Sequence, residues 1–519
     1  MAYINVENLT FAYPDAPQCA LQGVSFSLER GEMGVILGRS ASGKSTLLQL
    51  LCPAIAPKGR CSGQIDLSGA RVAFVHQDAE ASLVCDKVFA ELAFALENQG
   101  MARAQISLKI AETACFLNIE DLFACDVAAL SGGQKRMVAL AGALVAEPDV
   151  LILDEPVSSL DPLAAEHFLS ALVKVNRELG ITVLMSEHIA GGILPQCDVL
   201  GFLEAGEMAA FGPCAETARA LCGAGFADYL PVPVRLFSRL QPDVLPPVSV
   251  RGARVRLAAY LKERSAVHNT FSHTPLTPPE SKKNTALQFQ DVYFSYDRRR
   301  QPVLHGLDLK ASFGSVHGVV GCNGSGKSTL LKLASGVLRP LHGRCKVHGR
   351  AVMMPQEPLD LFCGDTLGED LAGADAALVH RFGLQKLLGR HPYDVSGGEA
   401  HMAAFVRILS GQPDILLLDE PTAGCDAQIK ARQKELLRGL AAAGKCVLVV
   451  SHDMEFLSEV CDRVSLLFGG ETVETMPARR FFASLSFYTT DAHRIGRGLV
   501  DNAVTLQDLL QAAGECGAP

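Results

Sequence analysis

The stretches GRSASGKST, at Gly38–Thr46, and GCNGSGKST, at Gly321–Thr329, decide the fold of this chain. Both match the pattern GxxxxGK[ST], in which a glycine-rich turn connects a buried strand to a helix. Glycines in such a turn let backbone N–H groups approach a phosphate without a clash from Cβ atoms. Because the pattern occurs twice, the sequence predicts a duplicated phosphate-binding domain.

Six elements recur in the same order in both halves of the chain. They are a tyrosine, the glycine-rich loop, a glutamine, an SGG segment, an apolar run that ends in Asp-Glu-Pro, and a histidine. Runs such as VLILD and ILLLD are typical of buried parallel strands, which favours an α/β fold. Outside the loops, the repeated residues are Tyr13, Gln77, Ser131–Gln134, Asp154–Glu155 and His188 in the first half, and Tyr296, Gln356, Ser396–Glu399, Asp419–Glu420 and His452 in the second.

This order of motifs resembles that of the ATP-binding-cassette (ABC) ATPases over residues 3–210 and 287–475. The resemblance implies two P-loop ABC ATPase domains, each with a mixed sheet core and a helical subdomain. We expect the first domain at 1–215, its tail and a proline-containing basic linker at 216–286, and the second domain at 287–480. A C-terminal extension at 481–519 contains VTLQDLLQAAG, which predicts a short amphipathic helix that packs on the second cassette.

The resemblance also implies that ATP and Mg²⁺ are the cofactors. In this family the tyrosine stacks on adenine, the glycine-rich loop holds the phosphates, and the SGG segment binds the γ-phosphate of the nucleotide on the other cassette. The two cassettes of this chain are therefore expected to pair with each other. The expected ATP-binding residues are Tyr13, Gly38, Ser40, Gly43, Lys44, Ser45, Thr46, Gln77, Ser131, Gly132, Gly133 and Gln134, and Tyr296, Gly321, Asn323, Gly324, Gly326, Lys327, Ser328, Thr329, Gln356, Ser396, Gly397, Gly398 and Glu399.

The resemblance assigns the catalytic and metal-binding residues in the same way. In the family the glutamate polarises the attacking water as a general base, and the histidine holds the γ-phosphate and the water in line. These roles fall on Glu155 and His188, and on Glu420 and His452. The expected Mg²⁺ ligands are Ser45, Gln77 and Asp154 in the first half, and Ser328, Gln356 and Asp419 in the second.

The two sites are not identical in sequence. Both keep the glutamate and the histidine, so we expect both to hydrolyse ATP, at unequal rates. Lys135 and Arg136 of the first SGG segment are replaced by Ala400 and His401 in the second. We therefore expect the composite site that uses the second SGG segment to be less basic.

Composition excludes several classes of protein. The chain of 519 residues carries a formal net charge of −9, which argues against a protein that mainly coats nucleic acid. No apolar run approaches the roughly 18–20 residues needed to span a bilayer, and the N-terminal MAYINVENLT lacks the features of a signal peptide. None of the 16 cysteines forms a CxxC pair, so we assign no metal site to cysteine.

The segment after Gln77, at 78–101, resembles the corresponding stretch of energy-coupling-factor (ECF) importers, where a coupling helix of a membrane subunit docks. The corresponding segment after Gln356 is shorter, which predicts a trimmed second helical subdomain. We therefore expect the ATPase motor of an ECF-like importer, peripheral on the cytoplasmic face of the membrane. The expected partners are an integral membrane coupling subunit and a substrate-binding membrane subunit, and the cargo of that family is a vitamin or a metal ion.

The connector favours one alternative, a soluble tandem-cassette ATPase that acts on the ribosome. Residues 231–286 are basic in an acidic chain, as in translation-type tandem cassettes. Against this, the connector is interrupted by prolines, and the loops VSSLD and TAGCD differ from the TNHLD of those proteins. Lipid headgroups or a solvated linker also explain the charge. The connector has Arg235, Arg239, Arg251, Arg254, Arg256, Lys262, Arg264, Lys282 and Lys283 against Asp243, Glu263 and Glu280.

Two further classes fit less well. Sugar-importer ATPases commonly have a degenerate second loop, whereas Gly321–Thr329 is intact. Soluble ATPases of DNA repair or iron–sulfur assembly would need a coiled-coil insertion or a cysteine cluster, and the sequence contains neither.

Overall fold

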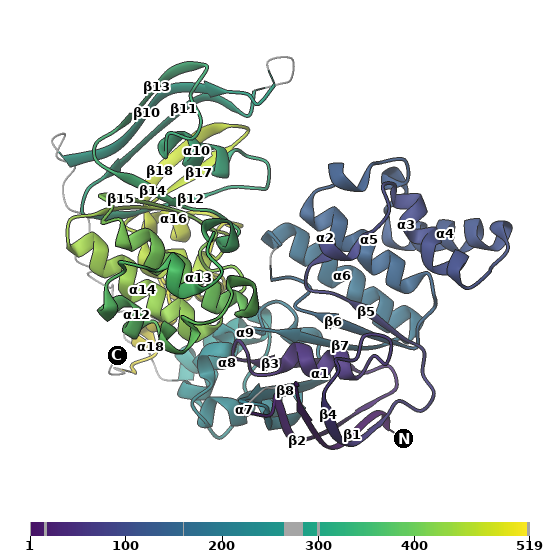
Figure 1. Ribbon diagram of the computed structural model, residues 1–519. Helices are drawn as coiled ribbons and strands as arrows, with labels where there is room; N and C mark the ends of the chain where they lie inside the picture. Colours follow the sequence, from purple (N-terminus) through teal and green to yellow (C-terminus); the bar gives the residue numbers. More distant parts are fainter. Residues whose placement is uncertain (1, 15–17, 159, 264–283, 298–301, 516–519) are drawn as a thin grey trace. The chain divides into compact units, whose positions relative to one another are not determined.

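The computed structural model describes residues 2–14, 18–158, 160–263, 284–297 and 302–515. The chain divides into two compact units, Met1–Ser249 and Val250–Pro519. Each unit contains one copy of the sequence repeat, and each is described here by itself (Figure 1). Residues 264–283, within the segment predicted to hold the tail and linker, lie outside the described residues.

The first unit is built on a six-stranded sheet with the order β5-β6-β7-β3-β8-β9. Its strands are parallel except for β9, which pairs antiparallel with β8. All residues of β3, β6 and β7 are buried, as expected for strands covered on both faces. The strands are β3 (Met33–Gly38), β5 (Val72–Val75), β6 (Val150–Asp154), β7 (Thr182–Glu187), β8 (Val199–Glu204) and β9 (Glu207–Pro213).

A three-stranded antiparallel sheet, β2-β1-β4, and several helices complete the first unit. In Figure 1 the helices α3, α4 and α5 lie together on one side of this unit, away from β1, β2 and β4. The elements are β1 (Ala2–Ala12), β2 (Leu21–Glu29), β4 (Arg60–Asp66), α1 (Lys44–Leu50), α2 (Ala79–Ser82), α3 (Val88–Asn98), α4 (Arg103–Leu117), α5 (Gly132–Leu144), α6 (Pro162–Leu179), α7 (Cys214–Gly223) and α8 (Val232–Leu240).

The second unit repeats this architecture strand for strand. Its six-stranded sheet has the order β14-β15-β16-β12-β17-β18, and its antiparallel sheet has the order β11-β10-β13. Each unit thus contains one mixed six-stranded sheet, which confirms the α/β fold with two mixed sheet cores. The strands are β10 (Thr285–Phe294), β11 (Leu304–Ser312), β12 (Ser315–Val320), β13 (His342–Val347), β14 (Ala351–Met354), β15 (Ile415–Asp419), β16 (Cys446–Val450), β17 (Arg463–Phe468) and β18 (Glu471–Pro477).

The helices of the second unit differ from those of the first. Between Gln356 and Ser396 the α-helices are the short α11 and α12, accompanied by three short 3-10 helices, so the helical region is trimmed, as its sequence length predicts. α18 forms within the segment predicted to be a short helix, and it packs against α17. The helices are α9 (Val250–Glu263), α10 (Lys327–Ala334), α11 (Leu367–Asp370), α12 (Ala376–Arg381), α13 (Gly397–Ser410), α14 (Ala427–Ala442), α15 (Met454–Val460), α16 (Ala478–Ser484), α17 (Asp491–Gly496) and α18 (Leu506–Ala512).

The helix α9 is part of the second unit although it follows the first repeat in sequence. It packs against α17 in the C-terminal extension, and Ala253, Leu257 and Tyr260 on α9 are buried. The basic connector and the C-terminal extension therefore share one packing interface.

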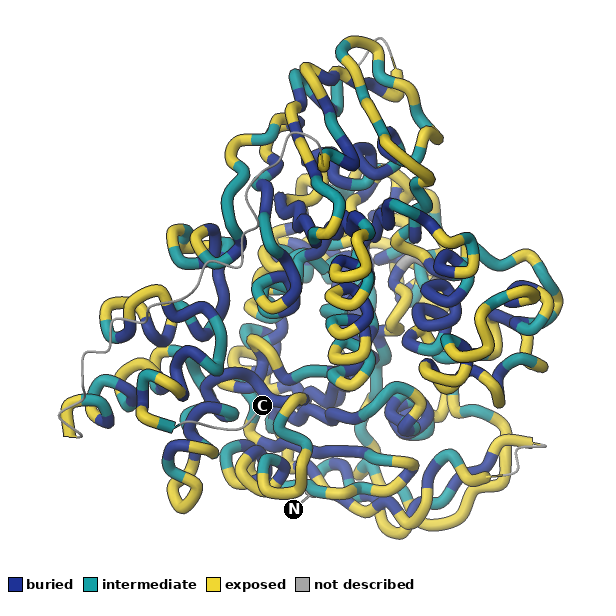
Figure 2. Tube along the Cα trace, turned by 90° about the vertical axis from the view of Figure 1, so that its left-hand side faces the viewer, coloured by how far each residue is buried: buried dark blue, intermediate teal, exposed yellow. Residues whose placement is uncertain are grey.

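Buried side chains are concentrated in the sheets and the elements packed on them. Figure 2 shows buried residues in the interior, with exposed residues on turns, hairpins and outer helices. No helix within the described ranges is both long enough and apolar enough to cross a bilayer.

Candidate active sites

Each glycine-rich loop joins a central strand to a helix. β3 ends at Gly38 and α1 begins at Lys44, while β12 ends one residue before Gly321 and α10 begins at Lys327. A Cβ atom on Gly38 would lie 2.3 Å from the carbonyl oxygen of Leu203, so only glycine fits there. A Cβ atom on Gly321 would likewise lie 2.3 Å from the carbonyl oxygen of Leu467. The backbone of each loop is therefore held against the neighbouring strand.

The two loop lysines are buried and fold back over their own loops. Nζ of Lys44 donates to the carbonyl oxygens of Gly38 and Arg39, at 3.0 Å each. Nζ of Lys327 donates to the carbonyl oxygens of Gly321 at 2.8 Å and of Cys322 at 3.0 Å. Both ammonium groups are thus positioned at the centre of a loop whose shape suits a phosphate.

Two of the three predicted metal ligands meet at each strand end, Ser45 with Asp154 at the end of β6 and Ser328 with Asp419 at the end of β15. Asp154 accepts hydrogen bonds from Ser186 Oγ, at 2.6 Å, and from Ser45. Asp419 accepts a hydrogen bond from Ser328. Burial raises the pKa of both aspartates, and the serine hydroxyl groups oppose that shift. A buried carboxylate beside a hydroxyl group is a set of hard oxygen donors that fits Mg²⁺.

Glu155 and Glu420 follow these aspartates in a strained backbone conformation. Their φ angles are +44° and +47°, in the left-handed region that glutamate rarely adopts. Each glutamate directly follows the last residue of its strand, and the charge of its own loop lysine acts on its carboxyl group. Such strain at equivalent positions in both repeats is typical of functional sites.

Glu155 is held by three side chains. Its Oε1 lies 2.8 Å from His188 Nε2 and 4.0 Å from Lys44 Nζ, and its Oε2 accepts a hydrogen bond from Gln77 Nε2 at 2.8 Å. Burial raises the pKa of Glu155, but the hydrogen bond and charge of His188, together with Lys44 and Arg136, hold it below its usual value. This carboxylate is therefore ionised and oriented.

Glu420 has a looser arrangement. The backbone N–H of His452 donates to its Oε2 at 3.2 Å, and His452 Nε2 lies 3.5 Å from its Oε1. The same Nε2 lies 3.2 Å from Asn323 Oδ1 in the glycine-rich loop. Burial is the main reason that the pKa of Glu420 rises to about 7. Gln77 and Gln356 are both exposed after their strands, and Gln77 donates a hydrogen bond to Glu155.

The predicted adenine-stacking tyrosines lie beside their own loops. Tyr13 Oη is 2.9 Å from Thr46 Oγ1, and Tyr296 Oη is 3.2 Å from Thr329 Oγ1. Both rings are exposed, so an aromatic face is available for stacking next to each phosphate loop.

Each SGG segment starts a helix with a capping box. Ser131 caps α5 with Gln134, and Ser396 caps α13 with Glu399. The glycines that follow each serine lie in the first turn of the helix, where backbone N–H groups lack intrahelical partners.

The expected difference in charge between the two SGG segments is not at the surface. Lys135, Arg136 and His401 are buried within their own units. These side chains follow the SGG segment on the buried face of the helix. The order of residues alone does not reveal which face of a helix is buried. The lower basicity of the second composite site stays a prediction, since buried charges also contribute to the electrostatics of a site.

Sequence reasoning also missed two residues of the first site. Ser186 Oγ accepts the N–H of Glu155 at 3.0 Å, in addition to its bond to Asp154, and the buried Glu187 follows it. Their position directly before His188 on β7 was the available signal.

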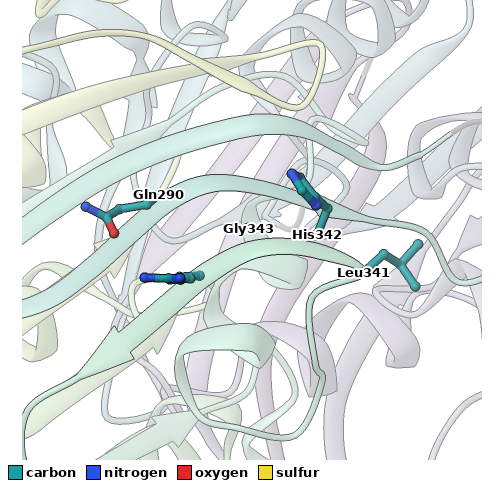
Figure 3. A pocket seen from close by; sticks show the side chains of 5 residues that line it. Gln290, Leu341, His342 and Gly343 are labelled. Atoms are coloured by element: carbon teal, nitrogen blue, oxygen red, sulfur yellow. The ribbon is translucent and has the colours of Figure 1, made fainter.

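A separate surface pocket of about 480 Å³ lies on the antiparallel sheet of the second unit (Figure 3). It contains none of the predicted site residues. Its lining residues are Gln290, Leu341, His342, Gly343 and Arg344.

Comparison with known proteins agrees with this geometry. The family model described as "ABC transporter" matches residues 21–158 and 304–423. A protein of Bacillus thuringiensis subsp. konkukian, named as an ABC transporter ATP-binding protein, is 33% identical and aligns over 99% of this chain and 98% of its own length. A Bacillus subtilis protein named for HMP/thiamine import ATP-binding is 29% identical, over 92% of each chain.

Solved structures show the same tandem fold. An archaeal ribosome recycling factor, in complex with a ribosomal stalk protein, superposes with a TM-score of 0.60 at 22% identity, over 92% of each chain. A structure titled RNase-L Inhibitor gives a TM-score of 0.59 at 22% identity, over 92% of this chain and 93% of its own. At this identity the likeness concerns the fold.

Proposed function

This chain belongs to the ABC transporter family and is an ATPase of that family, and we propose that it is the motor subunit of an ECF-like importer. In this role it would couple ATP binding and hydrolysis to transport by separate membrane subunits. The observation that carries the proposal is the similarity, over 92% of each chain, to a protein named for HMP/thiamine import. The cargo would be a vitamin or a metal ion.

The geometry supports a mechanism at each site. Lys44 and Lys327 would neutralise charge on the β- and γ-phosphates. Glu155 and Glu420 would accept a proton from the attacking water, with His188 and His452 holding it in line. Bound Mg²⁺ would supply charge neutralisation at the phosphate oxygens. Its proposed ligands are Ser45, Gln77 and Asp154, and Ser328, Gln356 and Asp419.

We further propose that the nucleotide sites are composite. Two domains, at 1–215 and 287–480, would pair so that each SGG segment completes the site of the other loop. The free N–H groups at the starts of α5 and α13 suit a γ-phosphate. Tyr13 and Tyr296 would stack on adenine.

The helical region of the first unit offers a surface for a membrane subunit. Four large apolar side chains after Gln77, on and near α3 and α4, are exposed. We propose that this surface receives an integral membrane coupling subunit, which in turn would contact a substrate-binding membrane subunit. The chain would then be peripheral on the cytoplasmic face. The exposed residues are Val84, Phe89, Phe94 and Leu108.

One observation favours the alternative, a soluble ATPase that acts on the ribosome. α9 exposes Arg251, Arg254 and Lys262 on the second unit. Such a basic surface could contact RNA phosphates. The likeness to ribosome-associated structures concerns the fold alone and does not by itself favour this function.

Affinity purification of the full chain from detergent-solubilised membranes distinguishes the two functions. The importer predicts recovery of a hydrophobic multi-helix protein that remains bound at high salt. A Phe89→Glu/Phe94→Glu variant should lose that protein while retaining the fold. Salt-sensitive cosedimentation with ribosomes, without a membrane protein, would overturn the importer proposal in favour of the alternative.

A further inference from the structure

The residue before the histidine links the same two segments in both units, by different chemistry. Asp154 pairs with Ser186 and Asp419 pairs with Val450 in the parallel sheets, so Glu187 and Ser451 are equivalent. The backbone N–H of Val157 donates to Glu187 Oε1 at 3.2 Å.

In the second unit, Thr422 Oγ1 lies 3.2 Å from Ser451 Oγ. Thr422 is the counterpart of Val157, since each is the third residue after its strand-end aspartate. Each link therefore ties the loop after the catalytic glutamate to the strand end that carries the histidine.

Both links are buried, and the two units differ at both residues of the link. Glu187 is 5% exposed and Ser451 is 0% exposed. A valine at 157 offers only its backbone N–H, so a long side chain must reach it. Thr422 offers a hydroxyl group, which a serine can reach. A serine is shorter than the glutamate that reaches the Val157 N–H, so the two residues of each link match in reach.

The surroundings of Glu187 indicate that its hydrogen bond matters more than its charge. Burial is the largest influence on Glu187 and raises its pKa to about 8, against the opposing effects of Lys44 and Arg136. A neutral carboxyl group still accepts the Val157 N–H through its carbonyl oxygen. Arg136, 4% exposed on α5, also interacts electrostatically with the ionised Glu155, so it keeps a counter-charge without Glu187.

We propose that Glu187 is a positioning residue of the first ATPase site, which fixes the loop after Glu155 to the segment that carries His188. Through this link it maintains the 2.8 Å contact between Glu155 and His188. The Thr422–Ser451 pair performs the same task in the second site. The inference rests on the proposed roles of Glu155 and His188.

The test isolates the first site in the full chain with Glu420→Gln. In this background Glu187→Ser should lower kcat for ATP by on the order of ten- to a hundredfold, because the catalytic pair loses its alignment. KM for ATP should stay within about twofold, since the link does not touch the nucleotide. Glu187→Gln keeps the acceptor and should retain kcat.

The decisive variant transfers the second unit's link to the first. Val157→Thr/Glu187→Ser should recover most of the kcat that Glu187→Ser loses. An unchanged kcat in Glu187→Ser, or a double variant no better than Glu187→Ser, would overturn the proposal. Loss of activity in Glu187→Gln equal to that in Glu187→Ser would also overturn it, because it would indicate a role for the ionised carboxylate.

Folding and site assignment are controlled separately. Thermal denaturation of each variant reports whether the unit is intact. If Glu187→Ser does not fold, the second site provides the reciprocal test in a Glu155→Gln background. There Thr422→Val should lower kcat and Thr422→Val/Ser451→Glu should restore it. An unchanged kcat in Thr422→Val, or a double variant no better than Thr422→Val, would contradict the proposal. Turnover that persists in Glu155→Gln/Glu420→Gln would instead show that the site assignment, rather than the link, is wrong.

Discussion

Oε1 of Glu155 lies 2.8 Å from Nε2 of His188, within hydrogen-bonding distance. The equivalent atoms of Glu420 and His452 are 3.5 Å apart. The first of these proposed catalytic pairs is therefore in hydrogen-bonding contact, while the atoms of the second lie several tenths of an ångström farther apart. Two sites with the same residues thus start from different geometries.

We expect Glu155→Gln and Glu420→Gln each to lower ATP turnover, with the larger loss in Glu155→Gln. The reason is that the first pair is preorganised and should carry more of the turnover. The double variant should fall by about a hundredfold or more, the usual contribution of a general base. Steady-state phosphate release by the purified full chain measures these rates. Full activity in either single variant would contradict the assignment.

Replacement of Gly38 by alanine should abolish nucleotide binding at the first loop. The new Cβ atom would lie 2.3 Å from the Leu203 carbonyl oxygen, which the strand cannot move without losing its pairing. Titration with a fluorescent ATP analogue measures the remaining sites. Gly142→Ala is the matched control, because nothing lies within 4 Å of its Cβ position in α5. It should bind normally and gain roughly 0.5–1 kcal/mol in stability.

Tyr13→Ala should weaken ATP binding at the first site by about tenfold, within the 1–3 kcal/mol typical of a stacking side chain. Tyr13→Phe keeps the aromatic face and loses only the bond to Thr46, so it should stay within about threefold of the parent affinity. Isothermal titration in the Glu155→Gln/Glu420→Gln background measures binding without hydrolysis. Equal losses in both variants would indicate that the hydroxyl group, and not the ring, is what matters.

Glu455→Gln should stabilise the second unit in a pH-dependent manner. Burial raises the pKa of Glu455 to about 8, with the charge of Asp491 adding to the shift. Between its unfolded pKa near 4.5 and about 8 the folded state binds more protons, so the carboxyl group costs more stability as pH rises. The variant should gain on the order of 1–3 kcal/mol at pH 8 and almost nothing at pH 5. Denaturant unfolding at both pH values tests this sign, and a gain that grows towards pH 5 would refute it.

Much of the fold could be predicted because the deciding signals are local. The loops at Gly38 and Gly321 and the apolar runs before Asp154 and Asp419 depend on short stretches of sequence. Each of them lies in the structure where its pattern predicts.

The remaining features depend on contacts between distant segments. The bond between Gln77 and Glu155, and the exposure of Gln356, follow from how each loop meets its strand end. The burial of Arg136 and His401 depends on the rotation of a helix, which the order of residues does not reveal. The role of Glu187 could not be predicted, because its partner is the backbone N–H of Val157 and nearly every residue has such a group.

The packing of α9 on α17 has a consequence for dividing the chain. The sequence repeat suggests a boundary in the linker, but a cut after Glu263 would leave α9 attached to the wrong half. Ala253, Leu257 and Tyr260 would then face water, with a penalty of roughly 1.5–3 kcal/mol for each large side chain. If the two halves are expressed separately, the boundary should lie between Ser249 and Val250. The unit defined by packing therefore begins one helix earlier in the chain than a boundary placed in the linker.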